Sequence, residues 1–423
     1  MFFKQTQFMK LIAVFFLVSF STGWLLPAGS TVEHHRYPHS KNHHAEQKTM
    51  NLDPKFMTAN RQFGFKLYAE LAKHSANKNI FVSPASILFA LAMAYNGAEG
   101  ETAEAMRKAM QLQNFKLEDL NAANQALKKM LETADPKVQM QIANSLWVKQ
   151  GAHFNPTFAT ANQTFYNAEA RELDFLSPAA AATINRWVND NTRGKIDKIV
   201  DQIDRDIILF LINAIYFKGQ WTKTFDPKNT REENFTLGSG QQKRVPMMTQ
   251  SGSFEYFEND KFQAITLPYS NRLFEMVIFL PRANTSLADF HKSLTAENWQ
   301  SWTTQFRAKE GSISLPRFKS AYEVELKAAL GALGMGQAFT DTANFSKMFQ
   351  PPQSVAISQV KHKAVVEVNE EGTEAAAVTS ITMRTTSLGP PPFRMVVDHP
   401  FFFAIREKQS GAILFMGSIV EPK

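Results

Sequence analysis

The sequence predicts one large α+β domain from Asp53 onward, because helical and strand patterns occupy different parts of the chain. Apolar residues recur near helical spacing in the first part of this region, whereas segments typical of strands dominate from residue 207 on. Several strand segments are apolar on both faces, which indicates a sheet that is covered on both sides. No repeat and no linker rich in Gly, Pro or Ser interrupts residues 53–423, so a single domain is expected.

The elements follow from these patterns in chain order. Ser83 and Pro84 form a helix start signal, and Gly97 follows the end of the same helix. Helices are predicted over residues 57–73, 86–95, 101–110, 117–131 and 184–191. Strands are predicted over residues 207–217, 262–267, 274–280, 311–315, 364–368, 395–397, 401–405 and 413–420.

The composition is that of a globular protein with a large core. Of the 423 residues, 44% are hydrophobic and 20% charged, which excludes wholesale disorder, and 36 Phe supply aromatic bulk. The absence of cysteine excludes a disulfide scaffold, a thiol nucleophile and a thiolate metal site. The formal charge of +7 is too small and too dispersed to indicate a nucleic-acid partner.

The first thirty residues have the layout of a secretory signal peptide. Lys4 and Lys10 precede an apolar run over residues 11–20, and small residues follow at 21–23 and 28–30. The alternative is an uncleaved anchor, for which the run is short. We expect residues 1–30 to be removed, after Gly23 or near residues 28–30, and the protein to be secreted and free of the membrane. In a Gram-negative host it would be periplasmic.

Residues 31–52 predict a leader rather than a folded element. Five of the ten histidines of the chain lie there, at positions 34, 35, 39, 43 and 44. They could bind a metal, since imidazole ligates zinc, copper and nickel. A solvated, disordered leader is the favoured interpretation, because nothing apolar nearby could hold a fixed geometry. No metal or cofactor is therefore expected.

The segment from Glu370 to Arg384 combines small residues with strand-like alternation. Its uncharged face consists of Thr373, Ala375, Ala377, Thr379, Ile381 and Met383, whereas Glu374 and Arg384 share the other face. A loop with this pattern could enter a sheet as a new strand and so act as a switch. The alternative is an ordinary surface loop with chance alternation.

Short motifs along most of the chain resemble the serpin family in their expected order. Residues 79–87 (Asn-Ile-Phe-Val-Ser-Pro-Ala-Ser-Ile) resemble the segment leading into the second helix of that family, and 217–221 (Phe-Lys-Gly-Gln-Trp) resemble the end of its third central strand. Further matches are residues 246–248, 330–335, 362–364, 399–403 and 414–417. Glu370, Glu371, Gly372, Thr373, Glu374, Ala375, Ala376 and Ala377 resemble the hinge of an inhibitory serpin.

The resemblance, which covers about residues 53–423, implies a fold and a function. The fold would have a large, mostly antiparallel central sheet, smaller sheets, about nine helices and an exposed mobile reactive loop at about residues 370–394. The protein would be a serine protease inhibitor and not an enzyme. It would act as a suicide substrate, in which protease attack forms an acyl-enzyme and insertion of the loop into the central sheet traps the protease. A monomer is expected.

Two other function classes are weaker. A non-inhibitory serpin that acts as a chaperone or small-molecule carrier would usually have bulky, charged or Pro residues in the hinge, unlike residues 372–377. A hydrolase is disfavoured because the chain has no Gly-x-Ser-x-Gly motif and no metal-ligand spacing.

Two counts based on the resemblance locate the reactive bond at Thr386–Ser387. The run of 17 residues that the family uses, counted from Glu370, ends at Thr386, and Pro400 lies 14 residues beyond it. A small Thr suits the shallow pocket of an elastase-like protease. Arg384, which a trypsin-like protease would prefer, and Met383 are the alternative reactive residues.

The resemblance also implies that two further groups of residues control the opening of the central sheet. Ser83, Ser86, Asn213 and His362 resemble its shutter, a buried polar cluster under the central strands. Trp221, Arg317 and Glu370 resemble its breach, where the loop first enters, and Arg317 is expected to pair with Glu370. Heparin binding is not supported, because residues 117–131 offer only Lys128 and Lys129 as a basic pair. Asn162, Asn234, Asn284 and Asn344 begin glycosylation sequons.

Overall fold

A computed structural model describes residues 52–75, 77–353, 355–373 and 391–423. These residues belong to one compact unit that spans Met50–Lys423. The signal peptide expected at residues 1–30 and nearly all of the leader expected at residues 31–52 lie outside the described residues. Both therefore stay predictions.

Within the described ranges the structure contains nine α-helices and fifteen strands. The helices are α1 (Pro54–Lys73), α2 (Pro84–Tyr95), α3 (Gly100–Ala109), α4 (Leu117–Thr133), α5 (Pro156–Tyr166), α6 (Ala180–Asn191), α7 (Leu287–Ser293), α8 (Ala296–Thr303) and α9 (Lys327–Leu330). The first strands are β1 (Ile80–Val82), β2 (Val138–Lys149), β3 (Glu169–Leu173), β4 (Leu209–Gln220), β5 (Arg231–Thr236), β6 (Gln242–Glu258), β7 (Phe262–Pro268) and β8 (Phe274–Pro281). The later strands are β9 (Arg307–Pro316), β10 (Phe318–Glu325), β11 (Gln359–Val368), β12 (Gly372–Thr373), β13 (Phe393–Val396), β14 (Phe401–Glu407) and β15 (Ile413–Ile419).

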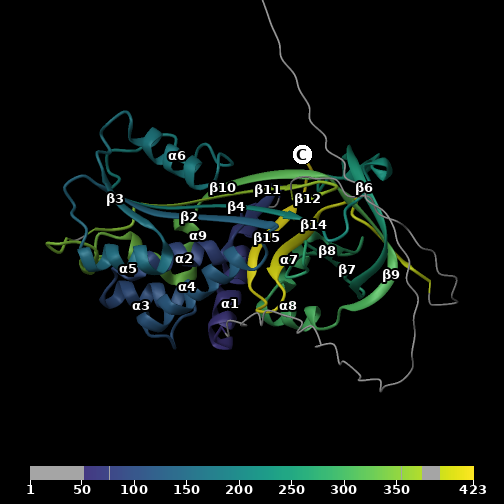
Figure 1. The fold of residues 1–423 in the computed structure, drawn as a ribbon, viewed down its shortest axis with the longest axis horizontal. Coiled ribbons are helices and arrows are strands. Elements are labelled where there is room, and N and C mark those ends of the chain that lie inside the picture. Colours follow the sequence, from purple (N-terminus) through teal and green to yellow (C-terminus); the bar gives the residue numbers. More distant parts are fainter. Residues whose placement is uncertain (1–51, 76, 354, 374–390) are drawn as a thin grey trace, which may run out of the picture. The chain divides into compact units, whose positions relative to one another are not determined.

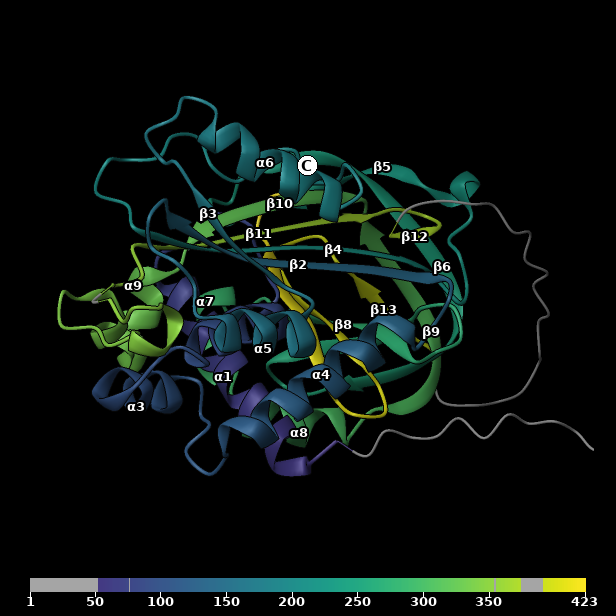
Figure 2. The same cartoon turned by 60° about the vertical axis from the view of Figure 1, so that its left-hand side comes forward.

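The central sheet carries the strands in the order β10-β11-β4-β2-β3, and β12 also pairs with β4. The pairs β10–β11, β4–β2 and β12–β4 are antiparallel, whereas β11–β4 and β2–β3 are parallel, so the sheet is mixed. β4 is buried on both faces along most of its length, which confirms the prediction of a strand that is apolar on both faces. Helix α2 covers one face and α6 the other (Figure 1 and Figure 2).

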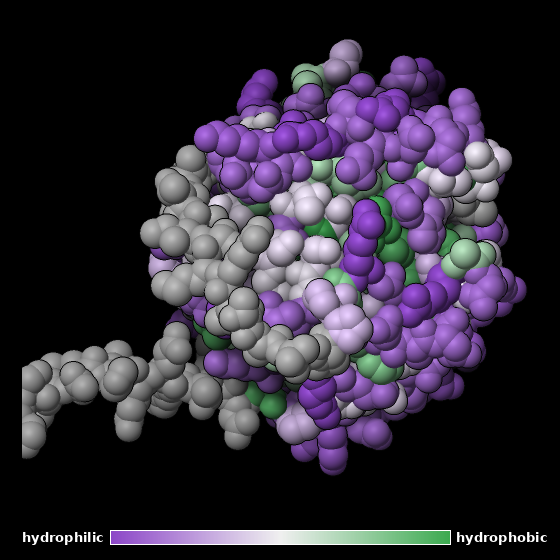
Figure 3. Space-filling view, turned by 90° about the vertical axis from the view of Figure 1, so that its right-hand side faces the viewer, coloured by the Kyte–Doolittle hydropathy of each residue, from purple (hydrophilic) through white to green (hydrophobic). Residues whose placement is uncertain are grey.

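The second sheet runs in the order β1-β15-β14-β8-β7-β6-β9-β13, with β5 attached to β6. Its buried strands bring aromatic rings together: Phe81 stacks on Phe415 with ring centroids 4.8 Å apart and on Phe403 at 5.8 Å. Helices α1, α7 and α8 pack near these strands (Figure 1). The face shown in Figure 3 is mostly hydrophilic, with hydrophobic residues scattered among the polar ones.

The predicted helices and strands are present with shifted ends, but the hydrophobic pattern of the sequence did not predict several other elements. Strands β2, β6 and β10 interleave polar residues with apolar ones, and β2 lies in a part of the chain that the sequence predicted to be largely helical. The structure also contains α5, α7, α8, α9, β1, β3 and β5, which were not predicted. These short elements are fixed by their neighbours in the fold rather than by their own patterns.

A close approach at Gly311 attaches β13 to the second sheet. Phe393 of β13 lies directly opposite Gly311 of β9, and its ring stacks on Tyr256 of β6 with centroids 3.9 Å apart. A Cβ atom built on Gly311 would lie 2.2 Å from the Phe393 ring. Only glycine therefore leaves room for this ring.

Replacing Gly311 by Ala should displace the Phe393 ring and destabilise the protein by about 1–3 kcal/mol, as overpacking does. Thermal unfolding of Gly311→Ala against wild type measures the loss. Gly238→Ala is the matched control, because a Cβ atom at Gly238 would have no neighbour within 4 Å. Equal thermal midpoints for the two variants would contradict this role of Gly311.

Candidate functional site

Strand β4 pairs with two different partners along the same edge. Its parallel ladder with β11 runs from the pair Phe210–Gln359 to the pair Tyr216–Val365. Beyond that point β12 pairs with β4 in the antiparallel sense, Gly372 opposite Gln220 and Thr373 opposite Gly219. The segment that follows β11 therefore turns back and pairs with the end of β4.

Hydrogen bonds from the Asn369 and Trp221 side chains and from the backbone hold the turn from β11 into β12. The Asn369 side chain accepts from the amides of Glu371 and Gly372, at 3.1 and 3.2 Å. Trp221 holds the turn from the other side, because its indole N–H donates to the Asn369 carbonyl at 3.0 Å and its amide to the Glu371 carbonyl at 2.9 Å. The Trp221 ring stacks on Tyr269 at 4.4 Å, which fixes its orientation.

Glu370 is a buried carboxylate with a complete set of partners. Its side chain is paired with Arg317 and accepts from the Thr230 hydroxyl at 2.6 Å, while its carbonyl accepts from the Phe225 amide at 2.7 Å. Burial alone would raise the pKa of Glu370, but the hydrogen bonds from Arg317 and Thr230 outweigh burial and hold the pKa below its ordinary value. The carboxylate is thus ionised and anchors the start of the turn.

Gly372 occupies a position that a larger residue could not share. Its φ of +139° lies in the region that favours glycine. A Cβ atom at this position would lie 2.3 Å from the Gly219 carbonyl oxygen and 2.7 Å from the Cα of Gln220. The absence of a side chain is what lets β12 reach the backbone of β4.

A row of buried polar residues crosses the central sheet near the middle of β4. Asn144 of β2, Asn213 of β4 and His362 of β11 lie directly opposite one another in the two ladders. The Asn213 amide donates to Asn144 Oδ1 at 2.5 Å and to the Ser86 hydroxyl at 2.5 Å. Ser83, the N-cap of α2, accepts from the Ser86 amide at 3.3 Å. The row therefore ties three strands to the start of α2.

The protonation of His362 follows from its partners. The Ser83 amide can only donate, and it points to Nε2 of His362 at 3.3 Å, so Nε2 carries the lone pair. The proton is then on Nδ1, which donates to Asn213 Oδ1 at 2.5 Å. Complete burial lowers the pKa of His362 to about 3, so the ring is neutral at physiological pH.

The structure brings the predicted site residues together in two groups. Trp221, Arg317 and Glu370 meet at the turn, next to Glu371, Gly372 and Thr373. Ser83, Ser86, Asn213 and His362 form one hydrogen-bonded cluster. The other predicted residues lie outside the described residues: Glu374, Ala375, Ala376, Ala377, Met383, Arg384, Thr386 and Ser387.

Sequence reasoning missed three residues of these groups. Asn144, Thr230 and Asn369 are single polar residues without a motif of their own. Asn144 could have been found only by knowing that β2 lies next to β4, and Thr230 only by knowing that its loop reaches Glu370. Asn369 directly precedes the hinge motif, and an Asn before a tight turn is a local signal that could have been used.

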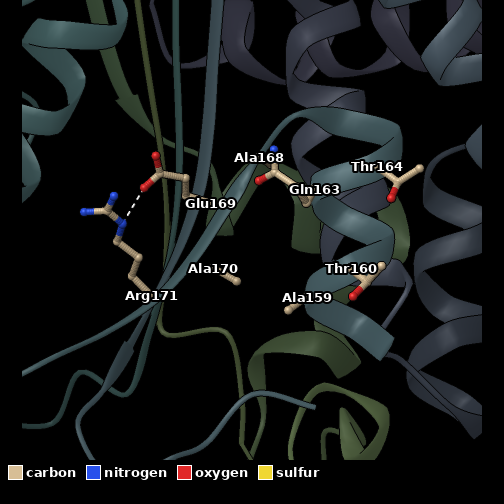
Figure 4. Close-up of a pocket in the computed structure, with 8 residues that line it drawn as sticks. All are labelled: Ala159, Thr160, Gln163, Thr164, Ala168, Glu169, Ala170 and Arg171. Carbon is tan, nitrogen blue, oxygen red and sulfur yellow. Dashed lines mark ion pairs between the residues drawn. The ribbon is translucent and has the colours of Figure 1, made fainter. Parts of the chain in front are cut away.

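The surface groove between α5 and β3 does not form a comparable site. A groove of about 520 Å³ lies between α5 and β3, but the charged ends of Glu169 and Arg171 point to the side of β3 away from α5 (Figure 4). Arg171 instead pairs with Glu169 and lies over the Trp147 ring. The part of the chain that the structure describes holds no cluster of metal-ligating side chains, and none of its helices is long and apolar enough to span a membrane.

Two minor predictions can be located on the structure. Lys128 of the predicted basic pair is buried and bonded to Glu132 at 2.7 Å. Of the four sequon asparagines, Asn162 is fully buried in α5, whereas Asn234, Asn284 and Asn344 are exposed. Glycosylation at Asn162 would therefore require α5 to open.

The buried histidine predicts a pH dependence of stability. Between pH 6.5 and 3 the unfolded chain binds a proton at His362 that the folded protein excludes, so stability should fall as the pH is lowered from 7 to 4. One excluded proton contributes about 1.4 kcal/mol per pH unit. His362→Gln should reduce this slope by about that amount, as measured by thermal midpoints across the range, while His291, whose pKa burial lowers to about 4, maintains part of the dependence. His74→Gln, which changes an exposed histidine, should not reduce it; an unchanged slope in His362→Gln would contradict the assignment.

Comparisons with known proteins agree with this geometry. The family model described as "Serpin (serine protease inhibitor)" matches residues 58–422. The chain is 37% identical over 362 residues to Serine protease inhibitor 42Dd of Drosophila melanogaster, covering 84% of this chain and 95% of that protein. It is 37% identical over 376 residues to the leukocyte elastase inhibitor of Bos taurus, covering 86% and 98%.

A solved structure is similar as well. The crystal structure of the thermophilic serpin tengpin in its native state superimposes with a TM-score of 0.80 at 31% identity, covering 88% of this chain and 95% of that one. The sequence match over most of the chain and the shared fold lead to the same conclusion: the chain belongs to the serpin family of serine protease inhibitors.

Proposed function

We propose that this chain is a secreted suicide-substrate inhibitor of serine proteases. A protease attacks the loop after residue 373 and becomes esterified to it; the cut loop then enters the central sheet between β11 and β4 and carries the protease with it. The observation that supports this most directly is β12, which already pairs with β4 beyond the point where the β11–β4 ladder ends. Insertion would extend an existing pairing rather than start a new one.

The register of β12 predicts where each loop residue would go. If the pairing continues, each further residue of the loop meets the preceding residue of β4, because the strands are antiparallel. Ala375 would then face Phe217, Thr379 would face Asn213, and Met383 would face Leu209, the first residue of β4. The 14 residues from Thr373 to Thr386 span about 45 Å, enough to run past the full length of β4.

This register agrees with the alternation of the loop. The β4 residues opposite the uncharged face of the loop include Leu211, Ile215 and Phe217, which are buried in the larger core cluster. On the other face, Glu374 would come opposite Lys218, a cross-strand pair of opposite charge. The residue pattern and the extended register therefore support the same orientation of the inserted strand.

Insertion of the loop would have to break one hydrogen bond of the polar row. His362 and Asn213 now bond directly across β11 and β4. A strand placed between them would move their backbones from about 4.8 Å to about 10 Å apart and break this bond. Thr379 would arrive at the same level, where its hydroxyl could donate to one partner and accept from the other. This exchange of partners keeps the buried polar groups satisfied.

The proposed reactive bond is Thr386–Ser387, and the proposed target is elastase-like. A small, β-branched Thr fits a shallow specificity pocket, and one relative is named as an inhibitor of leukocyte elastase. Arg384 with a trypsin-like protease, or Met383, are the competing assignments. Cutting after Arg384 would shorten the inserted strand by two residues and favour plain hydrolysis.

Changing Thr373 to Arg should abolish trapping without abolishing cleavage. The first residue on the buried face would become a cation without a prepared partner, a cost of at least several kcal/mol. The variant should be cut at Thr386–Ser387 by an elastase-like protease and release active enzyme. Denaturing electrophoresis, which preserves the covalent complex, and residual protease activity measure the two outcomes.

Glu374→Arg is the matched control, because position 374 points to the other face and already carries a charge. It should retain most of the inhibition. Equal trapping by both variants would show that the assignment of faces is wrong, and equal loss would show that the loop does not insert in this register. A wild-type chain that is only cleaved, with no complex, would favour a substrate or carrier instead.

Changing Thr386 to Arg should shift the preference from elastase-like to trypsin-like proteases, because the specificity pocket of the protease reads this side chain first. Association rates with one protease of each type measure the shift. In the wild-type complex, mass spectrometry should place the acyl link on Thr386. A link on Arg384 or Met383 would overturn the proposed bond while leaving the insertion mechanism intact.

A further inference from the structure

A second concave site lies between the last turns of α1, helix α7 and the end of β15. It is a partly enclosed cavity of about 300 Å³, at the lower end of the sizes that hold small ligands. Ala69, Ala72, Leu287 and Val420 give it mostly apolar walls. No residue of the turn at Asn369–Gly372 or of the polar row lines it.

Three polar side chains form a connected chain at one wall of this cavity. The Tyr68 hydroxyl lies 2.5 Å from the Ser418 hydroxyl, which lies 2.9 Å from Nε2 of His291. Tyr68 and Ser418 are buried, whereas His291 is partly exposed at the cavity. Burial raises the pKa of Tyr68 above its ordinary value and lowers the pKa of His291 to about 4, so both groups are neutral.

The direction of this chain fixes where the His291 proton is. If Nε2 carried the proton, it would donate to the Ser418 hydroxyl at 2.9 Å or to the Tyr68 hydroxyl at 3.4 Å, and one of these two buried hydroxyl protons would have no acceptor among the described residues, which is costly. The opposite direction satisfies every group: Tyr68 donates to Ser418, and Ser418 donates to Nε2. The proton is then on Nδ1, for which no hydrogen bond to a described residue is present. His291 therefore offers an N–H donor at the cavity.

The charged residues at the cavity are all cations. Lys73, Lys78 and Lys292 line it, and no Asp or Glu does. Lys73 pairs with Glu70 at 2.5 Å and Lys292 with Asp289 at 2.8 Å. The Lys78 ammonium has no ion pair within the described part of the chain, so it is the cation best placed to bind an incoming anion.

We propose that this cavity binds a small amphipathic carboxylate. The hydrocarbon part would lie against the apolar walls from α1 and α7. The carboxylate would accept from Nδ1 of His291 and pair with Lys78. This combination of apolar walls, one neutral donor and an unpaired cation distinguishes a carboxylate from an uncharged lipid and from a cationic amphiphile.

Calorimetric titration of the full-length protein with decanoate tests the proposal, with decanol and decyltrimethylammonium as probes of the head group. Decanoate should bind saturably at one site, decanol about tenfold more weakly because it lacks charged hydrogen bonds, and the cation not measurably. Ala72→Trp should fill the cavity and abolish decanoate binding. Lys78→Gln should weaken it about two- to fivefold, the contribution of an exposed ion pair.

Lys129→Gln is the matched control, because Lys129 is an exposed lysine on α4 that does not line the cavity. It should bind decanoate like the wild type. Lys78→Gln changes only a surface side chain, so it remains informative if Ala72→Trp folds poorly. No saturable binding, equal binding of all three probes, or equal weakening by Lys78→Gln and Lys129→Gln would overturn the proposal.

Discussion

The edge of β4 that faces β11 is the constraint on which the rest of the site depends. A strand edge can pair with only one neighbour at each residue. Here β11 pairs with residues 210–216 of β4, and β12 pairs with residues 219–220 at its end. The two partners run in opposite directions relative to β4, so neither can be extended without displacing the other. Gly372, Trp221 and the paired Glu370 hold the boundary between them where it is.

The polar row beneath this boundary holds the seam between β11 and β4 closed, although the proposed function requires the seam to open. An all-apolar seam between β11 and β4 would separate gradually, whereas the bond between His362 and Asn213 holds a single spacing. Because both residues are fully buried, losing one partner leaves a polar group unsatisfied, and intermediate spacings are disfavoured. The N-terminal cap of α2 shares the same groups, so the position of this helix is coupled to the state of the seam.

The sequence predicted the strongly patterned parts of this architecture well. The apolar residues of β4 and the helices with one buried face, such as α3 and α4, are where local pattern and tertiary burial agree. Strands β2, β6 and β10 were missed because their alternation is broken by polar residues whose burial depends on neighbours distant in the chain. At the site, family motifs pointed to Glu370, Arg317 and His362, but Asn144 and Thr230 could not be predicted, since only strand order and loop packing bring them there.

The positive φ of Gly372 and its contact with β4 also set how this protein can change over evolution. Under the proposed function, Gly372 and Thr373 set which face each later residue of the inserted strand occupies. Substitutions further along the loop would then change which protease is recognised without turning the side chains that precede them. An insertion or deletion of a single residue is different, because it would turn every later side chain to the opposite face. New specificities should therefore arise by replacement in this loop, and changes of length should come in pairs of residues.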